Sequence, residues 1–333
     1  MRADSFLLEP LSPFRLDLTV WVLRRRPDNL VDRWDGHTYR RVLALPAGLV
    51  EVAVTQIGSP ESPQLCVSVK NHPLHSKLRS AVTMVLERLL GLRINLARFY
   101  RFAARQAHLG QLARRFRGVK PPRFTTVFES VINAIASQQV SRTLGIRLLN
   151  RLAASYGAAI RADGEAAYAL PRPEELAGLR PADLRRVGFS RQKGRAMVEL
   201  AKSINEGGLD LEALAKLPDA EALEGLRRLP GVGSWTAEYV MLRGFGRTHI
   251  FPGGVAGVRN NLQRYLRQAN PVADAAARRT LERWHLYGGL IYFHLLLDRL
   301  SEEGFLALEA VPPQTGASNH TDTKQNIHKK ASR

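Results

Sequence analysis

The segment Leu226–Gly244, LRRLPGVGSWTAEYVMLRG, constrains the fold more than any other part of this 333-residue chain. Leu226 and Leu229 have the spacing of a helix end, and Pro230–Gly233 has the composition of a turn. Ser234 then begins a second stretch with helical spacing. The segment predicts two helices joined by a tight turn, with Ser234 capping the second helix.

The turn has the properties of an anion site. Gly231 and Gly233 tolerate positive φ and leave no side chain between the backbone and a ligand, so Leu229–Gly233 and the first N–H groups of the second helix face outward. PGVG alone is equally typical of an ordinary helix–helix turn, but the flanking LP and SWTAEY favour the anion site. The chain has 49 Lys plus Arg against 30 Asp plus Glu, a net charge of +19, which indicates a polyanionic partner.

Composition excludes several classes of protein. The one cysteine, Cys66, rules out an internal disulfide framework, a four-cysteine zinc site and an iron–sulfur cluster held by this chain. No apolar run reaches the roughly 18 residues of a membrane span, and the first residues lack a signal-peptide pattern. A basic amphipathic helix or lipidation motif, expected of a membrane-surface protein, is not evident. We expect a cytoplasmic protein, associated with the nucleoid if it is bacterial.

The chain divides by periodicity. A two-residue rhythm typical of strands marks the N-terminal part, and we expect a small antiparallel sheet there. The predicted strands are Leu16–Leu23, Tyr39–Leu45, Leu49–Ile57 and Leu65–Val69. From His72 onward the spacing is helical. Arg98–Arg123 holds eight Lys or Arg and no acid, which fits either a phosphate-facing surface or a solvated helix face.

The fold class is therefore α+β, mostly helical, with three predicted regions. Residues 1–120 form an N-terminal α/β domain with the sheet and a basic helical connector, which ends near Pro121-Pro122. Residues 121–311 form a helical domain, and residues 312–333 are a polar, disordered tail. Within the helical domain, a helix with an apolar stripe that includes Phe128 ends in the polar Gln138 and Gln139.

Four ordered blocks resemble the helix–hairpin–helix DNA glycosylases, specifically the 3-methyladenine DNA glycosylase II type. They lie between about Pro122 and Leu300. The blocks are FESVINAIASQQVS, GFSRQKGRAMVELA, LPGVGSWTAEYVMLRGFGR with the following IFP and GVRNNLQ, and WHLYGGLIYFHLLLDRL. The resemblance implies a protein that bends DNA, extrudes one nucleotide and breaks its base–sugar bond.

The resemblance also assigns roles. Gln138 or Gln139 matches the region whose side chain fills the gap left by the extruded base, with a solvated helix end as the alternative. Trp235 stands where lyase-type relatives carry a lysine nucleophile, so a Schiff base is not expected and the enzyme is at most monofunctional. The residues expected at the DNA backbone are Leu229, Gly231, Gly233, Ser234, Thr236 and Arg259. The residues expected near the base are Trp235, Phe128, Tyr239, Trp284, Tyr287 and Tyr292, whose aromatic rings would attract a cationic methylated purine.

The position of the family's catalytic aspartate holds Val255 in this chain. Phe251, Pro252 and Arg259 fit the surrounding frame without gaps, and nothing from His249 to Gln268 is acidic. Losing a positioned acid–base group costs roughly 10²–10⁴-fold in rate. Glu238 is the nearest acid in sequence, either a substitute catalyst or a salt-bridge or capping residue; Asp298 is a more remote candidate.

Two functions follow from the resemblance. The first is a monofunctional glycosylase that removes alkylated bases from duplex DNA, slowed by Val255; the second is a non-catalytic damaged-DNA-binding descendant of such an enzyme. A general nucleic-acid-binding protein is disfavoured because the blocks around the base pocket persist. We expect a monomer, no organic cofactor or redox metal, and at most a monovalent cation held at Leu229–Gly233.

Overall fold

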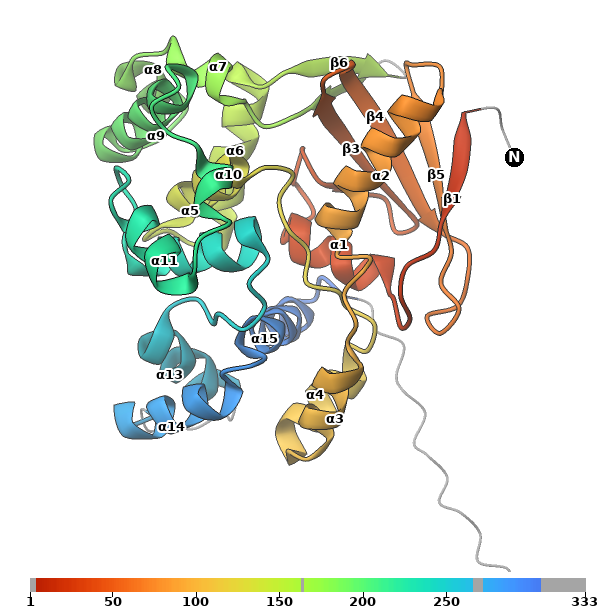
Figure 1. Ribbon diagram of the computed structural model, residues 1–333, viewed down its shortest axis with the longest axis vertical. Coiled ribbons are helices and arrows are strands. Elements are labelled where there is room, and N and C mark those ends of the chain that lie inside the picture. Colours follow the sequence, from red (N-terminus) through yellow and green to blue (C-terminus); the bar gives the residue numbers. More distant parts are fainter. Residues whose placement is uncertain (1–3, 163–164, 266–271, 307–333) are drawn as a thin grey trace, which may run out of the picture.

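A five-stranded antiparallel sheet covered by helices forms the N-terminal part of the computed structural model (Figure 1), which describes residues 4–162, 165–265 and 272–306. The strands are paired in the order β1-β5-β4-β3-β2. Their bounds are β1 (Ser5–Leu8), β2 (Arg33–Trp34), β3 (Thr38–Leu45), β4 (Gly48–Gln56) and β5 (Leu65–Lys70). Three of the predicted strands are confirmed as β3, β4 and β5. Helices α1 (Leu16–Arg24) and α2 (Ser76–Leu90) pack against this sheet.

The prediction of a strand at Leu16–Leu23 is wrong, because this segment is the helix α1. Leu16, Val20 and Leu23 pack into the core beneath the sheet. Leu18 and Val22 pack into a second core formed with the C-terminal helices. A helix that is buried on two faces has an apolar stripe on each face. In α1 the two stripes together give a sequence in which apolar and polar residues alternate as in a strand.

The rest of the described chain is mostly helical, and the α+β fold class is confirmed. The elements are α3 (Ala97–Ala104), α4 (Ala107–Arg115), α5 (Val127–Ser137), α6 (Arg142–Tyr156), β6 (Ala159–Ala162), β7 (Glu165–Tyr168), α7 (Pro173–Ala177), α8 (Pro181–Arg186), α9 (Arg191–Asn205), α10 (Leu211–Leu214), α11 (Asp219–Arg227), α12 (Ser234–Val240), the π-helix η1 (Met241–Phe245), α13 (Gly254–Tyr265), α14 (Asp274–Trp284) and α15 (Gly288–Glu302). The hairpin β6–β7 corrects the prediction of unbroken helical structure after His72. In the described part of the chain, no helix combines the length and the apolar character needed to cross a membrane.

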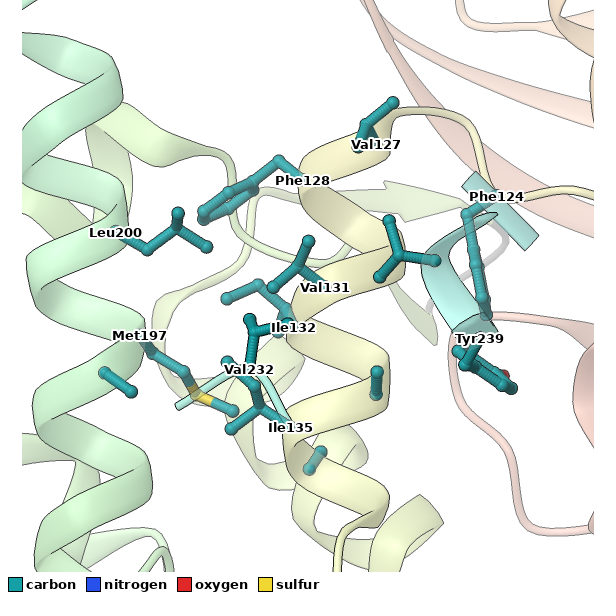
Figure 2. Close-up of a cluster of buried hydrophobic side chains, with 14 of the residues drawn as sticks. Phe124, Val127, Phe128, Val131, Ile132, Ile135, Met197, Leu200, Val232 and Tyr239 are labelled. Atoms are coloured by element: carbon teal, nitrogen blue, oxygen red, sulfur yellow. The ribbon is translucent and has the colours of Figure 1, made fainter. Parts of the chain in front are cut away.

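Helix α5 lies at the centre of the helical part. Its residues from Val127 to Ala136 are all buried, and Figure 2 shows Met197 and Leu200 of α9 facing one side of it. The C-terminal helices instead share a core with α1, α3 and α4, so chain segments far apart in sequence pack together. The division between residues 120 and 121 stays a prediction, and the predicted tail at 312–333 lies outside the described residues.

A buried ion cluster joins the sheet to α5. The Arg41 guanidinium on β3 contacts both Asp32 and the Glu129 carboxylate on α5, and the Tyr39 hydroxyl donates to Asp32 over 2.6 Å. Burial alone would lower the pKa of Arg41, but the two carboxylates raise it well above its usual value. Removing one partner of such a buried pair leaves an uncompensated charge, which strongly destabilises a fold.

We expect His294 on α15 to make folding sensitive to acid. Its ring is 1% exposed, contacts Phe99 at 4.9 Å between centroids, and binds the Leu290 carbonyl through Nδ1 over 2.8 Å. Burial lowers the pKa of His294 from 6.5 to about 4. At a pH between these values, the unfolded chain binds a proton that the folded chain does not. The unfolding free energy therefore decreases as the pH is lowered through this range, by up to about 3 kcal/mol.

Chemical denaturation of the His294→Met variant from pH 7.5 down to 4 tests this expectation. The variant should lose less stability than the unmodified protein as the pH falls below 6.5, whereas a His285→Met control at an exposed position should follow the unmodified protein. Identical pH dependence of all three proteins would contradict it.

Candidate functional site

The predicted helical hairpin is formed by α11, the turn 228–233 and α12. Gly231 has φ +73°, and a Cβ there would lie 2.6 Å from the Ala196 Cβ, so both backbone and packing require glycine. Hydrogen bonds from Val232 N to Leu229 O (3.1 Å) and from Ala237 N to Gly233 O (2.9 Å) fix the turn. A Cβ on Gly233 would meet no atom within 4 Å, so the molecular surface is open at this residue.

Ser234 does not cap α12, which corrects the prediction. The N-cap is Gly233, with the extended backbone typical of that position, and Ser234 is the first helical residue. The exposed Ser234 hydroxyl instead accepts a hydrogen bond from Arg227 Nη2 over 3.1 Å. Gly233 has no side chain to satisfy the first amides of α12, which are left for an external acceptor such as a phosphate.

Gln138 and Gln139 follow α5 and have different environments. Gln138 Nε2 donates to Gly231 O and to Thr236 Oγ1, both over 2.8 Å, so this side chain joins α5 to the hairpin. Gln139 is exposed and has φ +51°, in the left-handed region that non-glycine residues rarely adopt. Of the two glutamines, only Gln139 is free to project from the surface.

The same contacts place Thr236 inside the protein. It is 2% exposed and accepts from Gln138, so its hydroxyl is not at the surface where a DNA-backbone contact was predicted. Lys193 of α9 was not singled out from the sequence. Its Nζ donates to Ala136 O over 3.2 Å and to Gln138 O over 2.7 Å, and so satisfies carbonyls at the end of α5.

These elements border a groove of about 630 Å³. It is lined by Gln138, Gln139, Lys193, Leu229, Gly231, Gly233, Ser234, Trp235 and Thr236, among others. The structure thus brings together the predicted hairpin and the predicted wedge region on two sides of one groove.

Trp235 stacks on Tyr239, with ring centroids 5.2 Å apart and planes at 28°. Trp235 is half-buried, lines the groove and packs against the core, which combines the two roles considered for it. Tyr239 is buried, and the Arg243 guanidinium lies 5.9 Å from its ring centroid. Because Tyr239 already contacts these two groups, Trp235 is the better placed of the two rings to meet a base from the groove.

Arg25 reaches this region from the N-terminal part of the chain, and sequence analysis missed it. Its Nη2 donates to Asn133 Oδ1 over 2.8 Å and its Nη1 to the Tyr239 hydroxyl over 3.4 Å. It sits within three consecutive arginines, Arg24–Arg26, of which Arg24 is also buried, and no sequence signal distinguishes the arginine that reaches Asn133 from its neighbours.

Val255 is the second residue of α13, whose N-terminus lies beside the Trp235 ring. A Cβ placed on Gly253 would be 3.4 Å from Trp235 Cδ1. Gly253 and Gly254 both have positive φ, +94° and +49°, and this bend starts the helix next to α12. The start of α13 and the Trp235 ring are therefore adjacent.

The Glu238 carboxylate occupies this same helix start. Its Oε2 accepts from Gly253 N over 2.7 Å, and a Cβ on Gly254 would lie 3.8 Å from its Oε1. Burial raises the pKa of Glu238, while the Gly253 amide, the Arg227 charge and the Gly254 amide partly oppose that rise. The capping interpretation made from sequence thus has a direct structural basis, and Glu238 contacts the two glycines that precede Val255.

Other predicted residues are not gathered here. Phe128 lies on the opposite side of α5 from Tyr239 (Figure 2) and lines a separate cavity. Trp284 packs on Phe251 at 5.9 Å, and Tyr287 packs on Phe102 of α3 at 4.8 Å.

Tyr292 lies closer to the site than these residues. Its ring meets Phe251 edge-on at 5.8 Å, and burial, with the nearby Tyr239 hydroxyl, raises its pKa to about 12.

Two charged residues that were predicted to serve the site form ion pairs within the protein. Arg259 pairs with Asp274 over 2.8 Å, and Asp298 pairs with Arg115 over 2.7 Å. Asp298 is therefore part of the contact between α15 and α4.

The cation predicted at Leu229–Gly233 would be held by main-chain carbonyls. Leu229 O and Gly231 O each accept one hydrogen bond, from Val232 N and Gln138 Nε2, and each retains one lone pair. Oxygen donors of this kind fit a hard cation. Within the described ranges, no group of three or more His, Cys, Asp or Glu side chains could hold a metal ion.

Comparison with known proteins finds similarity to DNA repair proteins. Residues 132–291 match the model described as HhH-GPD superfamily base excision DNA repair protein. The chain is 23% identical over 291 residues to a DNA-3-methyladenine glycosylase of Bacillus subtilis (strain 168), covering 85% of this chain and 94% of that protein. It is 30% identical over 190 residues to DNA-3-methyladenine glycosylase 2 of Escherichia coli (strain K12), covering 56% of this chain and 63% of the relative, less than two thirds of its length.

A solved structure has the same fold over most of the chain. The 3-methyladenine DNA-glycosylase from Archaeoglobus fulgidus superimposes with a TM-score of 0.76 at 26% identity, covering 89% of this chain and 98% of that one.

The two glutamines give a matched test of the α5–hairpin link. Gln138→Ala removes both hydrogen bonds to the hairpin and should lower the unfolding free energy by about 1–2 kcal/mol. Gln139→Ala should leave stability unchanged or raise it slightly, because it removes only an exposed side chain. Urea denaturation of both variants measures this, and equal destabilisation would show that Gln138 does not hold the hairpin.

Proposed function

We propose that this chain, whose residues 132–291 match the model described as HhH-GPD superfamily base excision DNA repair protein, is a monofunctional DNA N-glycosylase that extrudes and removes alkylated bases from duplex DNA. The observation that carries the proposal is the groove between the hairpin and the end of α5. On one side of it, open backbone amides at Gly233 and Ser234 suit a DNA phosphate. On the other, Gln139 projects at the position suited to filling the gap in the stack.

Extrusion of a damaged base costs a few kcal/mol of stacking and pairing, least where the base pairs badly. The Trp235 ring offers a stacking surface that partly offsets this cost. Arg25 and Asn133 hold the Tyr239 hydroxyl, and so fix the ring on which Trp235 stacks. A preorganised surface of this kind lowers the entropy lost on binding.

Base release breaks the bond between C1′ of the sugar and the base nitrogen. The bonding electron pair leaves with the base, positive charge develops on the sugar ring, and water adds to C1′ with loss of a proton. Trp235 cannot form an imine, so the reaction ends at an abasic site with the DNA strand intact.

Glu238 is the group we assign to the developing charge. Its carboxylate lies at the start of α13, where the family's aspartate would stand one residue beyond Gly254. The rise in its pKa caused by burial makes the carboxylate a stronger base than a solvated one. One of its oxygens is held by Gly253 N, so the other is the oxygen available to the sugar or to the attacking water.

The alternative is a non-catalytic protein that binds damaged DNA. The observation that favours it is that Glu238 already serves as the acceptor for the first amides of α13, a purely structural role. In that case the groove and the Trp235 surface would still bind DNA, and only the chemical step would be missing. The partner in both cases is duplex DNA, and we propose a monomer as the acting form. A monovalent cation on the carbonyls of Leu229 and Gly231 would strengthen the phosphate contact without entering the reaction.

Base release from alkylated duplex DNA under single-turnover conditions tests the proposal with three proteins. We expect the unmodified protein to exceed the spontaneous rate, Glu238→Gln to lose about 10²–10⁴-fold, and Val255→Asp to be faster than the unmodified protein. The glutamine in Glu238→Gln can still accept from Gly253 N, so α13 should keep its start, which a thermal melt and binding to an abasic duplex would verify.

Each other outcome identifies a different error. Release that survives Glu238→Gln would exclude the role given to Glu238. Release by Val255→Asp alone would establish the non-catalytic alternative. No release by any of the three, with no preference for an abasic duplex, would reject the glycosylase proposal.

A further inference from the structure

A second groove, separate from the one beside the hairpin, lies between the α3–α4 hairpin and the C-terminal helices. It has a volume of about 350 Å³, and Arg105, His108 and Arg283 are at its rim. Its floor is apolar and includes Leu262, Trp284 and Ile291. Arg105 comes from the connection between α3 and α4, and Arg283 from the last turn of α14, so two elements far apart in sequence direct guanidinium groups to one place.

Arg105 and Arg283 at the rim, and five further arginines on the helices that contribute to this groove or adjoin it, are not neutralised within the described part of the chain. They are exposed, and none of them makes an ion pair or side-chain hydrogen bond among the described residues. They are Arg98, Arg101, Arg105 and Arg114 on α3–α4, and Arg278, Arg279 and Arg283 on α14. By contrast, Arg115 on α4 is paired with Asp298, and Arg259 on α13 is paired with Asp274 at the start of α14.

An unneutralised set of arginines on a folded surface repels itself and is stabilised by a polyanion. Guanidinium groups bind phosphate oxygens in a bidentate way, and their planes pack on aromatic or sugar surfaces. Basic groups that line a groove from two sides, above an apolar floor, fit a nucleic-acid backbone better than a solvated helix face.

The groove also lies at a suitable distance from the site of base release. Leu262 on its floor is seven residues along α13 from Val255, about 10 Å at 1.5 Å per residue. If the duplex runs parallel to α13, this corresponds to a displacement of about three base pairs at roughly 3.4 Å per base pair. Trp284 of the floor packs on Phe251, the residue that leads into the bend before α13.

We propose that this groove binds the phosphate backbone of the duplex about three base pairs to one side of the extruded nucleotide. The inference rests on the proposed function for the position of that nucleotide. The contact adds affinity without reading sequence, since phosphates carry no sequence information. The contact also makes binding asymmetric about the extruded nucleotide, because the groove lies on one side of Val255 along α13.

The test uses duplexes of about 20 base pairs, roughly 70 Å long, each with one abasic analogue. The analogue is placed at the centre, about three base pairs from one end, or about three base pairs from the other end. Binding is measured by fluorescence anisotropy at several salt concentrations. The variant Arg105→Gln/Arg283→Gln removes the two rim charges. The control Arg161→Gln/Arg185→Gln removes two exposed arginines of β6 and α8, at the opposite end of the molecule (Figure 1).

The unmodified protein should bind the central duplex and one off-centre duplex equally, and the other off-centre duplex roughly tenfold more weakly. The rim variant should lose roughly tenfold on the first two duplexes only, and its salt slope on them should fall by about 2. The control should retain the unmodified behaviour. A loss by the rim variant that is equal on all three duplexes, or absent on all three, would overturn the proposal.

These outcomes are distinguishable from failure of the proposed function. Base release with no positional effect of the rim variant rejects the groove contact and leaves the glycosylase intact. A positional effect without base release supports the groove contact on a protein that lacks the chemistry.

Discussion

The contact on which the rest of this structure depends is the attachment of α5 to the N-terminal part of the chain. Arg41 of β3 binds Glu129 at the start of α5, and Arg25, just after α1, binds Asn133 one turn further on. Both guanidinium groups are buried, and so are the groups that they contact. A buried charge is tolerated only with its partners in place, so these contacts specify how the sheet sits against the helix rather than adding much net stability. The end of that helix carries Gln138 and Gln139, and the position of the groove follows from it.

Another buried cation of the interior is held differently. Arg243 lies in the π-helix η1 and is fully buried, with the rings of Phe124 and Phe293 at 4.6 and 5.4 Å from its guanidinium carbon. Burial lowers the pKa of Arg243, since in the described chain no carboxylate pairs with it. Ring faces replace only part of the lost hydration. The π-helix, a turn form often found at functional positions, places this charge between Tyr239 and the C-terminal helices, beneath the aromatic stack that faces the groove.

Local sequence patterns predicted the elements whose conformation depends mainly on neighbouring residues. The strands β3, β4 and β5 and the helical hairpin follow from alternation and from glycine chemistry, and they were predicted within one or two residues. The wrong or missing predictions have a common cause, which is contact between segments that are far apart in the sequence. Helix α1 was taken for a strand because two cores, one of them made with C-terminal helices, each impose a stripe on it. Gln138 and Gln139 look equivalent in sequence, and only the hairpin 93 residues away separates a structural amide from an exposed one. Arg25 is identical in pattern to its neighbours, and its partner Asn133 lies 108 residues away.

The start of α13 shows how this helix is capped without a carboxylate at residue 255. Two glycines with positive φ bring the chain to the helix, and their amides have no partner within α13. Glu238 supplies an acceptor from the neighbouring helix, so the cap does not depend on the identity of residue 255. A carboxylate introduced at residue 255 would add a negative charge beside the glycines that Glu238 contacts, and each acid would raise the pKa of the other. With valine there, residue 255 adds no such charge. Under the proposed function, burial raises the pKa of Glu238 without a further rise from a second carboxylate at residue 255, so the proposed chemistry would depend on Glu238.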